Sequence, residues 1–158
     1  MHRVMLSIAS NCNPVCNLQE ARSGLLQMLS DVRFTSAIWT EPYRSASQQA
    51  VDNSSASQQR GSEAAAPPAL YLNQIATANT DLGFEELCAA LKQMEISLGR
   101  TSEMKRKGQV CIDLDILLYD DDRYHEKDWQ RPYVADLLKE LSQSAGMNDW
   151  LTTPRNNT

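Results

Sequence analysis

Two aspartates one residue apart, Asp113 and Asp115, interrupt an otherwise apolar run, CIDLDILLY, at residues 111–119. Successive side chains of a strand point to opposite faces, so both carboxylates lie on one face, roughly 7 Å apart. They repel each other at that separation, and apolar neighbours add a cost of desolvation. One or two divalent cations would remove both penalties, and Mg²⁺ favours carboxylate, phosphate and water oxygens. The pair therefore predicts a magnesium site, and the alternative is a pair of aspartates on a solvated sheet face.

Three further features favour a site for a magnesium-bound nucleotide together with a planar heterocycle. Glu95 falls in the middle of the apolar stripe of a predicted helix, an unusual place for a carboxylate. Tyr71 and Asn73 alternate onto one face of another predicted strand, where they offer an aromatic wall and an amide to a flat, hydrogen-bonding ring. A basic loop that could fold over a polyphosphate precedes the aspartates, and its charged residues are Arg100, Lys105, Arg106 and Lys107.

Hydrophobic periodicity predicts the elements that position these residues. Alternation predicts strands at residues 4–8, 32–40, 70–80 and 110–119, and helical spacing predicts helices at residues 18–29, 83–99 and 131–144. Asn17 and Glu20 resemble a capping pair for the first helix. The order β-α-β-β-α-β, followed by a helix, is that of the ferredoxin-like α+β fold, an antiparallel sheet with helices on one face. The other face is free to hold a site. On the last strand, the residues predicted to lie under the helices are Ile112, Leu114, Ile116 and Leu118.

The chain of 158 residues is long enough for one domain with a substantial core. We expect this domain to span residues 1–145. Residues 44–69 contain almost no large apolar side chains and repeat the sequence SASQQ, so they predict a flexible insertion. Residues 146–158 are expected to form a loose tail.

Composition limits the partners and the compartment. The net charge of −5 argues against a general nucleic-acid surface, which needs a basic face. The first residues fit neither a signal peptide nor a membrane span. Four cysteines without zinc-site spacing predict reduced thiols and a cytoplasmic protein. A monomer is expected, because the sequence shows no coiled-coil or exposed apolar stripe that demands a partner.

Several short stretches resemble the 6-hydroxymethyl-7,8-dihydropterin pyrophosphokinase family over about residues 3–141. LSIASN is similar to the opening strand of that family, with Asn11 kept. WTEP resembles its pterin-walling segment, YLN its third-strand motif, and MEISLGR a segment that supplies Glu95 and Arg100. The match of IDLDILLYD, which contains both aspartates, is the most specific.

The resemblance implies transfer of pyrophosphate from ATP to the pterin alcohol, with release of AMP, and two Mg²⁺ ions held by Asp113 and Asp115. Arg100 would assist the reaction together with these aspartates. The implied pterin-binding residues are Thr40, Pro42, Tyr43, Tyr71, Asn73 and Tyr133. The implied nucleotide-binding residues are Glu95, Arg100, Arg106, Ile116 and Arg131.

The sequence departs from the family mainly in the nucleotide clamp, by which we mean the basic residues that would bind the phosphates of ATP. Val110 stands where the family has an arginine, and valine cannot bind a phosphate. Arg106 or Lys107 could reach in from the basic loop, although lysine does not replace a bidentate guanidinium. The segment after the last strand lacks the Pro-His motif of the family, and the context of its one histidine, His125, does not match. Two smaller departures are Ala9 for a glycine and Lys92 for a neutral polar residue.

Three functions are therefore compatible with the sequence. The first is a working pyrophosphokinase with an altered clamp. The second is a binding protein of the same fold that retains pterin or nucleotide affinity but has little turnover. The third is an unrelated ferredoxin-like interaction domain, which would show no magnesium-dependent nucleotide binding and would lose nothing on Asp113→Ala.

Overall fold

The structure, a computed structural model, describes residues 1–41, 70–99 and 101–143. The insertion and the tail predicted from the sequence lie outside these ranges. Three predicted site residues, Pro42, Tyr43 and Arg100, lie outside them as well.

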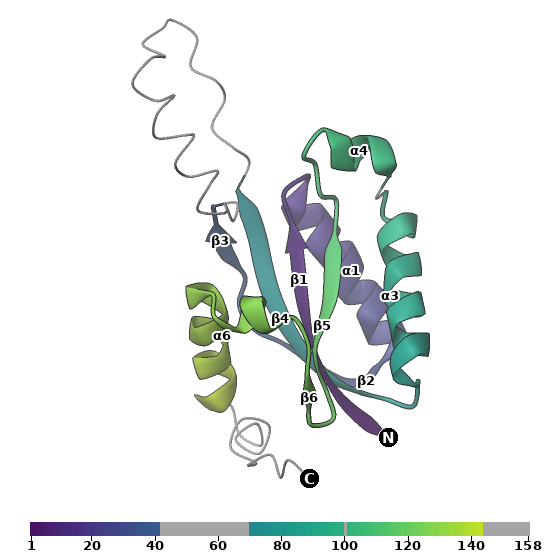
Figure 1. Cartoon of the computed structure of the whole chain (residues 1–158), viewed down its shortest axis with the longest axis vertical. Coiled ribbons are helices and arrows are strands. Elements are labelled where there is room, and N and C mark those ends of the chain that lie inside the picture. The colour runs from purple at the N-terminus through teal and green to yellow at the C-terminus, as the bar shows by residue number, and fades with distance from the viewer. Residues whose placement is uncertain (42–69, 100, 144–158) are drawn as a thin grey trace, which may run out of the picture.

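The described chain forms an antiparallel sheet that carries the site (Figure 1). Its strands are β1 (His2–Ser10), β2 (Ser30–Phe34), β3 (Ile38–Thr40), β4 (Tyr71–Thr80), β5 (Asp113–Tyr119) and β6 (Asp122–Arg123). Their order is β2-β4-β1-β5-β6, and β3 pairs with β4 beyond the end of β2. This arrangement, with the first strand in the middle of the sheet, confirms the predicted ferredoxin-like α+β class.

Helices cover both faces of the sheet, but unequally. On one face, α1 (Pro14–Met28) and α3 (Phe84–Ser97) bury the larger core over apolar residues of β1, β4 and β5. On the other face, α6 (Pro132–Gln143) packs Val134, Leu137 and Leu141 against Met5, Ile75 and Leu117. The sequence did not assign a face to this last helix. The apolar contacts of α6 include Met5 of β1 but not Ala9, which lies nearer the end of that strand. The part of the sheet around Ala9 and Asp113 is therefore not covered by these contacts, and a pocket lies there.

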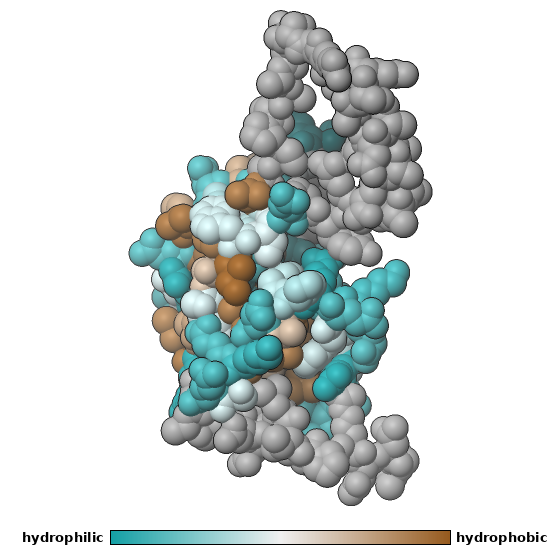
Figure 2. Space-filling model, turned by 90° about the vertical axis from the view of Figure 1, so that its left-hand side faces the viewer, coloured by the Kyte–Doolittle hydropathy of each residue, from teal (hydrophilic) through white to brown (hydrophobic). Residues whose placement is uncertain are grey.

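The surface over α6 and β3 mixes hydrophilic and hydrophobic side chains, with the hydrophobic ones in separate patches (Figure 2). Two short helices, α4 (Ser102–Arg106) and α5 (Glu126–Trp129), were not predicted from the sequence, and α4 lies in the segment predicted as a basic loop. Every helix of the described chain is too short or too polar to cross a membrane.

The predicted capping pair of the first helix is wrong. The helix begins at Pro14, after Asn13 in a left-handed conformation, because proline lacks the N–H that a helix start leaves unpaired and has a helical φ. Asn17 lies inside the first turn, where its Nδ2 donates to the carbonyl of Cys12 at 2.6 Å.

The single strand predicted at residues 32–40 is two strands, β2 and β3, separated by a break at residues 35–37. At the break, Thr35 Oγ1 accepts a hydrogen bond from the Ile75 N–H at 3.0 Å and donates one to the Ser36 carbonyl at 2.8 Å. The threonine side chain thus replaces part of the strand ladder. The pairing with β4 is shifted by one residue across the break, from Phe34 opposite Ala76 to Ile38 opposite Asn73.

One face assignment on β5 is also wrong. Ile112, Leu114 and Ile116 contact the larger core as predicted, whereas Leu118 packs with α6 on the opposite face. The register with β1 shifts between Met5 and Leu6, which adds one residue to β5 and reverses its alternation. Tyr119 consequently takes the place under α3, and its hydroxyl donates to the carbonyl of Leu82 at 2.7 Å.

Candidate functional site

The two aspartates lie on the sheet face opposite α1 and α3, in register with small side chains of β1. Asp113 is paired with Ala9, and Asp115 with Ser7. Ala9 is also paired with Asn73 of β4, so Asn73, Ala9 and Asp113 form one row across three strands. A small residue in the middle of this row leaves room above the sheet.

A pocket of about 300 Å³ opens over this row, and we call it the sheet pocket. β3 and β4 contribute one side of it, and the segment leading into α6 contributes the other. The site residues predicted from the sequence that line this pocket are Thr40, Tyr71, Asn73, Asp113, Asp115, Arg131 and Tyr133. The structure thus brings together every described residue for which the sequence predicted pterin contact.

Asn73 is held in a fixed orientation at the floor of the sheet pocket. It is 3% exposed, and its Nδ2 donates to Thr40 Oγ1 at 2.7 Å and to the Ile38 carbonyl at 3.1 Å. These bonds fasten β3 to β4. They use the donor side of the amide, so Oδ1 is the atom through which Asn73 can accept from a ligand.

A second pocket, of about 490 Å³, lies on the other side of the aspartates against α3, and we call it the α3 pocket. Two predicted nucleotide-binding residues, Glu95 and Ile116, line it together with Asp113 and Asp115. Lys92 and His125 supply basic groups to its lining, and Thr101 and Ser102 bring the start of α4 to its rim. The two pockets therefore share the carboxylate pair.

The structure gives a physical reason for the carboxylate in the apolar stripe of α3. Glu95 is 7% exposed, and its Oε1 accepts a hydrogen bond from the backbone N–H of Leu114 at 2.8 Å. β6 pairs with β5 only at Leu118 and Tyr119 in the described chain, so this N–H lies on a strand edge that β6 does not reach. Glu95 satisfies that donor and fixes the strand between the two aspartates.

The charge environment of Asp115 favours a cation. Burial and the negative charges of Asp113, Asp128 and Glu95 together raise the pKa of Asp115 to about 6, against the opposing effect of His125. A group of crowded carboxylates in a partly buried site is the arrangement that a divalent cation relieves. The oxygen donors of Asp113 and Asp115 fit Mg²⁺, which is the ion predicted from the sequence.

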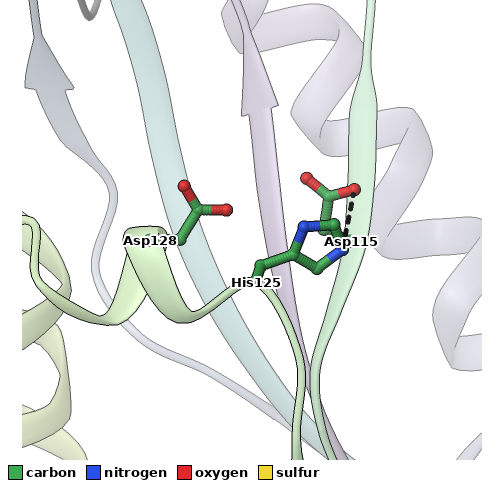
Figure 3. A group of neighbouring side chains, drawn as sticks. All are labelled: Asp115, His125 and Asp128. Carbon is green, nitrogen blue, oxygen red and sulfur yellow. Dashed lines mark ion pairs between the residues drawn. The ribbon is translucent and has the colours of Figure 1, made fainter.

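Two more side chains that could ligate a metal, those of His125 and Asp128, lie next to Asp115 (Figure 3). Both come from the segment after β6. The ligating atoms of these three residues lie within 4.8 Å of one another, and His125 Nε2 is 3.7 Å from Asp115 Oδ1. His125 reaches this place because its backbone is left-handed, with φ of 56°, directly before α5. Neither His125 nor Asp128 was among the site residues predicted from the sequence, although side chains three residues apart become neighbours when they share a turn of helix.

Arg131 and Tyr133 line the sheet pocket together with Tyr71. Arg131 Nη2 lies 3.2 Å from Asp128 Oδ1. Burial raises the pKa of the Tyr133 hydroxyl, and the neighbouring guanidinium of Arg131 acts in the opposite direction. Tyr133 therefore stays neutral at physiological pH and can present its ring to a flat ligand.

Neither pocket is lined by Arg106, a predicted nucleotide-binding residue, or by Val110, which stands in place of the arginine of the family. Arg106 is exposed on α4. Val110 is fastened by its backbone: its N–H donates to Asn11 Oδ1 at 2.6 Å, and its carbonyl accepts from the Asn11 N–H at 3.0 Å. Asn11 is thus a structural link between the end of β1 and the segment that enters β5.

Comparison with known proteins gives one family. The sequence model of the family described as 7,8-dihydro-6-hydroxymethylpterin-pyrophosphokinase matches residues 5–143. The mitochondrial folate synthesis bifunctional protein of Pisum sativum is 41% identical over 83 residues, which are 48% of this chain and 16% of the relative. That of Arabidopsis thaliana, also named mitochondrial, is 37% identical over 87 residues, 50% of this chain and 16% of the relative.

A bacterial protein gives a similar match. The folate synthesis bifunctional protein of Chlamydia muridarum is 32% identical over 81 residues, which are 45% of this chain and 18% of the relative. The chain therefore matches less than a fifth of the length of these relatives.

Proposed function

Because the chain belongs to the 7,8-dihydro-6-hydroxymethylpterin-pyrophosphokinase family, we propose that it transfers pyrophosphate from ATP to 6-hydroxymethyl-7,8-dihydropterin. The products are AMP and the pterin diphosphate. One observation carries this proposal: Asp113 and Asp115 line the sheet pocket and the α3 pocket at once. A reaction between two substrates needs such a shared wall, since the atoms that react must meet between the pockets.

The sheet pocket suits the pterin. Tyr71 and Tyr133 contribute aromatic rings to its lining, and Asn73 offers a fixed carbonyl oxygen to the donors of the ring edge. The hydroxymethyl group would then lie towards the aspartates. Burying the ring between these side chains also excludes water, which would otherwise compete with the pterin oxygen for the phosphorus atom.

The α3 pocket suits the nucleotide. Lys92 and His125 are the basic side chains in its described lining, and Ile116 offers an apolar contact. Asp113 and Asp115 would hold Mg²⁺, which when bound neutralises the phosphates and favours departure of AMP. The pterin hydroxyl oxygen forms a bond to the β-phosphorus, the bond from that phosphorus to the AMP oxygen breaks, and the hydroxyl proton passes to solvent. The chain itself contributes positioning and charge.

The test is release of AMP from ATP in the presence of Mg²⁺ and the pterin. We expect pterin-dependent AMP from the wild-type protein and a loss of at least about 100-fold in Asp113→Asn and Asp115→Asn, the range for a lost electrostatic group. Asp136→Asn is the matched control, because Asp136 is an exposed aspartate of α6 that lines neither pocket. Folded wild-type protein that releases no AMP would exclude the enzyme.

A second candidate is a relative that binds both ligands with little turnover. It is favoured by Val110, whose side chain cannot replace the arginine of the family, and by the position of Arg106 outside both pockets. Calorimetric titration with the pterin and with an ATP analogue separates the two candidates. Binding of both without AMP release supports the second candidate, and binding of neither supports an unrelated interaction domain.

Two further predictions complete this proposal. The cytoplasmic location rests on the reduced thiols that the cysteine pattern predicts. The monomer rests on the sequence, which shows no coiled-coil pattern or exposed apolar stripe that demands a partner.

A further inference from the structure

Trp129, the last residue of α5, lines neither pocket, but it contacts the turn that carries His125. The Cζ atom of Arg123 lies 4.2 Å from the centroid of the indole ring, within the range of a cation–π contact. The indole Nε1 donates a hydrogen bond to the Tyr124 carbonyl at 3.0 Å. Trp129 therefore joins the end of this turn to its beginning, on either side of His125, and we call residues 123–129 the α5 turn.

The backbone of His125 needs support from its neighbours. Its φ of 56° is left-handed, a conformation that costs free energy in most residues other than glycine and persists only where the surrounding structure imposes it. The side chain gives little support, because it is exposed and its Nε2 lies 3.7 Å from Asp115 Oδ1 (Figure 3). Inside the turn, the Asp128 N–H donates to the His125 carbonyl at 2.8 Å. The contacts of Trp129 add a constraint that spans the left-handed residue from both sides.

The α5 turn is also anchored to the helices on both faces of the sheet. Trp129 is partly buried and packs against the cluster that α6 forms with the sheet, which includes Leu117 and Val134. At the start of the turn, the Tyr124 ring stacks on Phe84 of α3, with the ring centroids 4.5 Å apart and an angle of 22° between the planes. The Tyr124 N–H donates to the Leu117 carbonyl at 3.0 Å. The turn is thus fixed between α3 and α6.

We propose that Trp129 is a positioning residue, which holds His125 next to Asp115 and thereby supports binding of the nucleotide in the α3 pocket. Arg123 acts with it through the cation–π contact. His125 lines that pocket, so a turn that moves away from Asp115 takes a basic, hydrogen-bonding group away from the phosphates. The placement of His125 stands on the contacts alone, and only its effect on nucleotide binding rests on the proposed function.

Proton NMR of the histidine rings tests the placement without a ligand, because the chain contains two histidines, His2 and His125. In EDTA at one fixed pH, we expect Asp115→Asn to shift the His125 ring signals of the wild type, through the 3.7 Å contact. In Trp129→Leu, Asp115→Asn should shift them much less. Each comparison is made within one background, so the ring current of the indole cancels. Trp39→Leu is the matched control, because Trp39 is 51% exposed on β3 and lines neither pocket.

Calorimetry with Mg²⁺ and α,β-methylene-ATP, which binds without being cleaved, measures the effect on the α3 pocket. We expect Trp129→Leu to bind about fivefold more weakly than the wild type, at the low end of coupling between sites. In the His125→Ala background, Trp129→Leu should change the affinity by less than about twofold, because nothing is left for it to position. Trp129→Phe keeps a ring beside Arg123 and should bind nearly as tightly as the wild type. Trp39→Leu should bind as the wild type does.

An equal shift of the His125 signals by Asp115→Asn, with and without the indole of Trp129, would overturn the placement. An equal loss of affinity with and without the His125 imidazole would show that Trp129 does not act through this residue. If Trp129→Leu does not fold, Arg123→Ala takes its place with the same expectations, since Arg123 is exposed and only the cation over the ring is lost. Failure of the wild type to bind the nucleotide would overturn the proposed function, while the NMR comparison would still decide the placement.

Discussion

The carboxyl group of Asp115 holds its proton more tightly in the folded protein than in an unfolded chain. Its pKa rises from the ordinary value of 3.8 to about 6, since it is partly buried and faces Asp113. A raised pKa stabilises the fold below pH 4, where the group is protonated in both states. That contribution is lost as the pH rises through 6, where the folded protein must accept the charge. The metal-free protein is therefore stabilised least at the pH where a cation would bind best.

Asp115→Asn should remove the destabilising negative charge that the metal-free protein carries above pH 6. At pH 7.5 in EDTA we expect the variant to be more stable than the wild type by about 1–2 kcal/mol, after allowance for solvent screening. For a domain of this size that corresponds to roughly 2–8 °C in the unfolding temperature. Thermal unfolding followed by circular dichroism between pH 4 and pH 8 measures it. A variant whose unfolding temperature follows the wild-type pH profile would contradict the assignment, and Asp136→Asn controls for the loss of one charge.

Some residues of the site could be predicted from their type and spacing in the sequence, and others could not. Asp113, Asp115, Tyr71 and Asn73 were predictable, because alternation along a strand fixes which side chains share a face. His125 and Asp128 were not, since they reach Asp115 through a left-handed residue and a single short turn of helix, which leave no periodic pattern.

At the scale of elements, the open edge of β5 is the feature that the strand pattern alone could not reveal. Glu95 of α3 closes it by accepting the Leu114 N–H. The sequence showed that this carboxylate was out of place in an apolar stripe, but it could not show the partner, because that partner is a backbone group of another element. The break at Thr35 and the added residue in β5 escaped prediction for the same reason: both are set by pairing with a neighbouring strand.

Two substitutions of Glu95 separate support of β5 from contact with the nucleotide. Glu95→Gln keeps an oxygen that accepts from Leu114, so its stability should stay within about 0.5 kcal/mol of the wild type. Glu95→Leu leaves the N–H buried and unpaired, and should cost about 1–3 kcal/mol. Urea unfolding measures both. An unchanged KM for ATP in Glu95→Gln would show that the side chain acts through β5, whereas a raised KM would show nucleotide contact.

At the scale of the whole molecule, the sheet pocket combines side chains from two distant parts of the described chain. Tyr133 comes from the first turn of α6 and Arg131 directly precedes this helix, whereas Thr40 comes from β3. Near its end, the Glu140 carboxylate accepts bonds from the Ser36 N–H at 2.7 Å and from the Ser36 hydroxyl at 2.6 Å, at the break that precedes β3. The order of elements predicted the fold, but the face covered by α6 followed only from its contacts.

Glu140→Ala should therefore affect the two substrates unequally. Loss of the bonds to Ser36 weakens the link between α6 and the segment that leads into β3, and leaves the apolar packing of Ile38 against the α6 cluster in place. We expect KM for the pterin to rise about threefold or more, a cost of roughly 0.7 kcal/mol or greater, while KM for ATP stays within a factor of two. Lys139→Ala is the neighbouring control on the same helix. Equal increases for both substrates would point to a general loss of stability instead.

The pairing of Thr40 with Tyr71 has a consequence for the length of the chain between them. Residues 41–70 connect two residues that are paired with each other in the sheet. The two ends of this connection are therefore held at the same separation, whatever the number of residues between them. The entropy lost on closing such a connection grows only with the logarithm of its length, so halving it changes the closure free energy by about 0.6 kcal/mol. Length at this position is nearly neutral for the fold, and insertions and deletions can accumulate here without shifting the strands on either side.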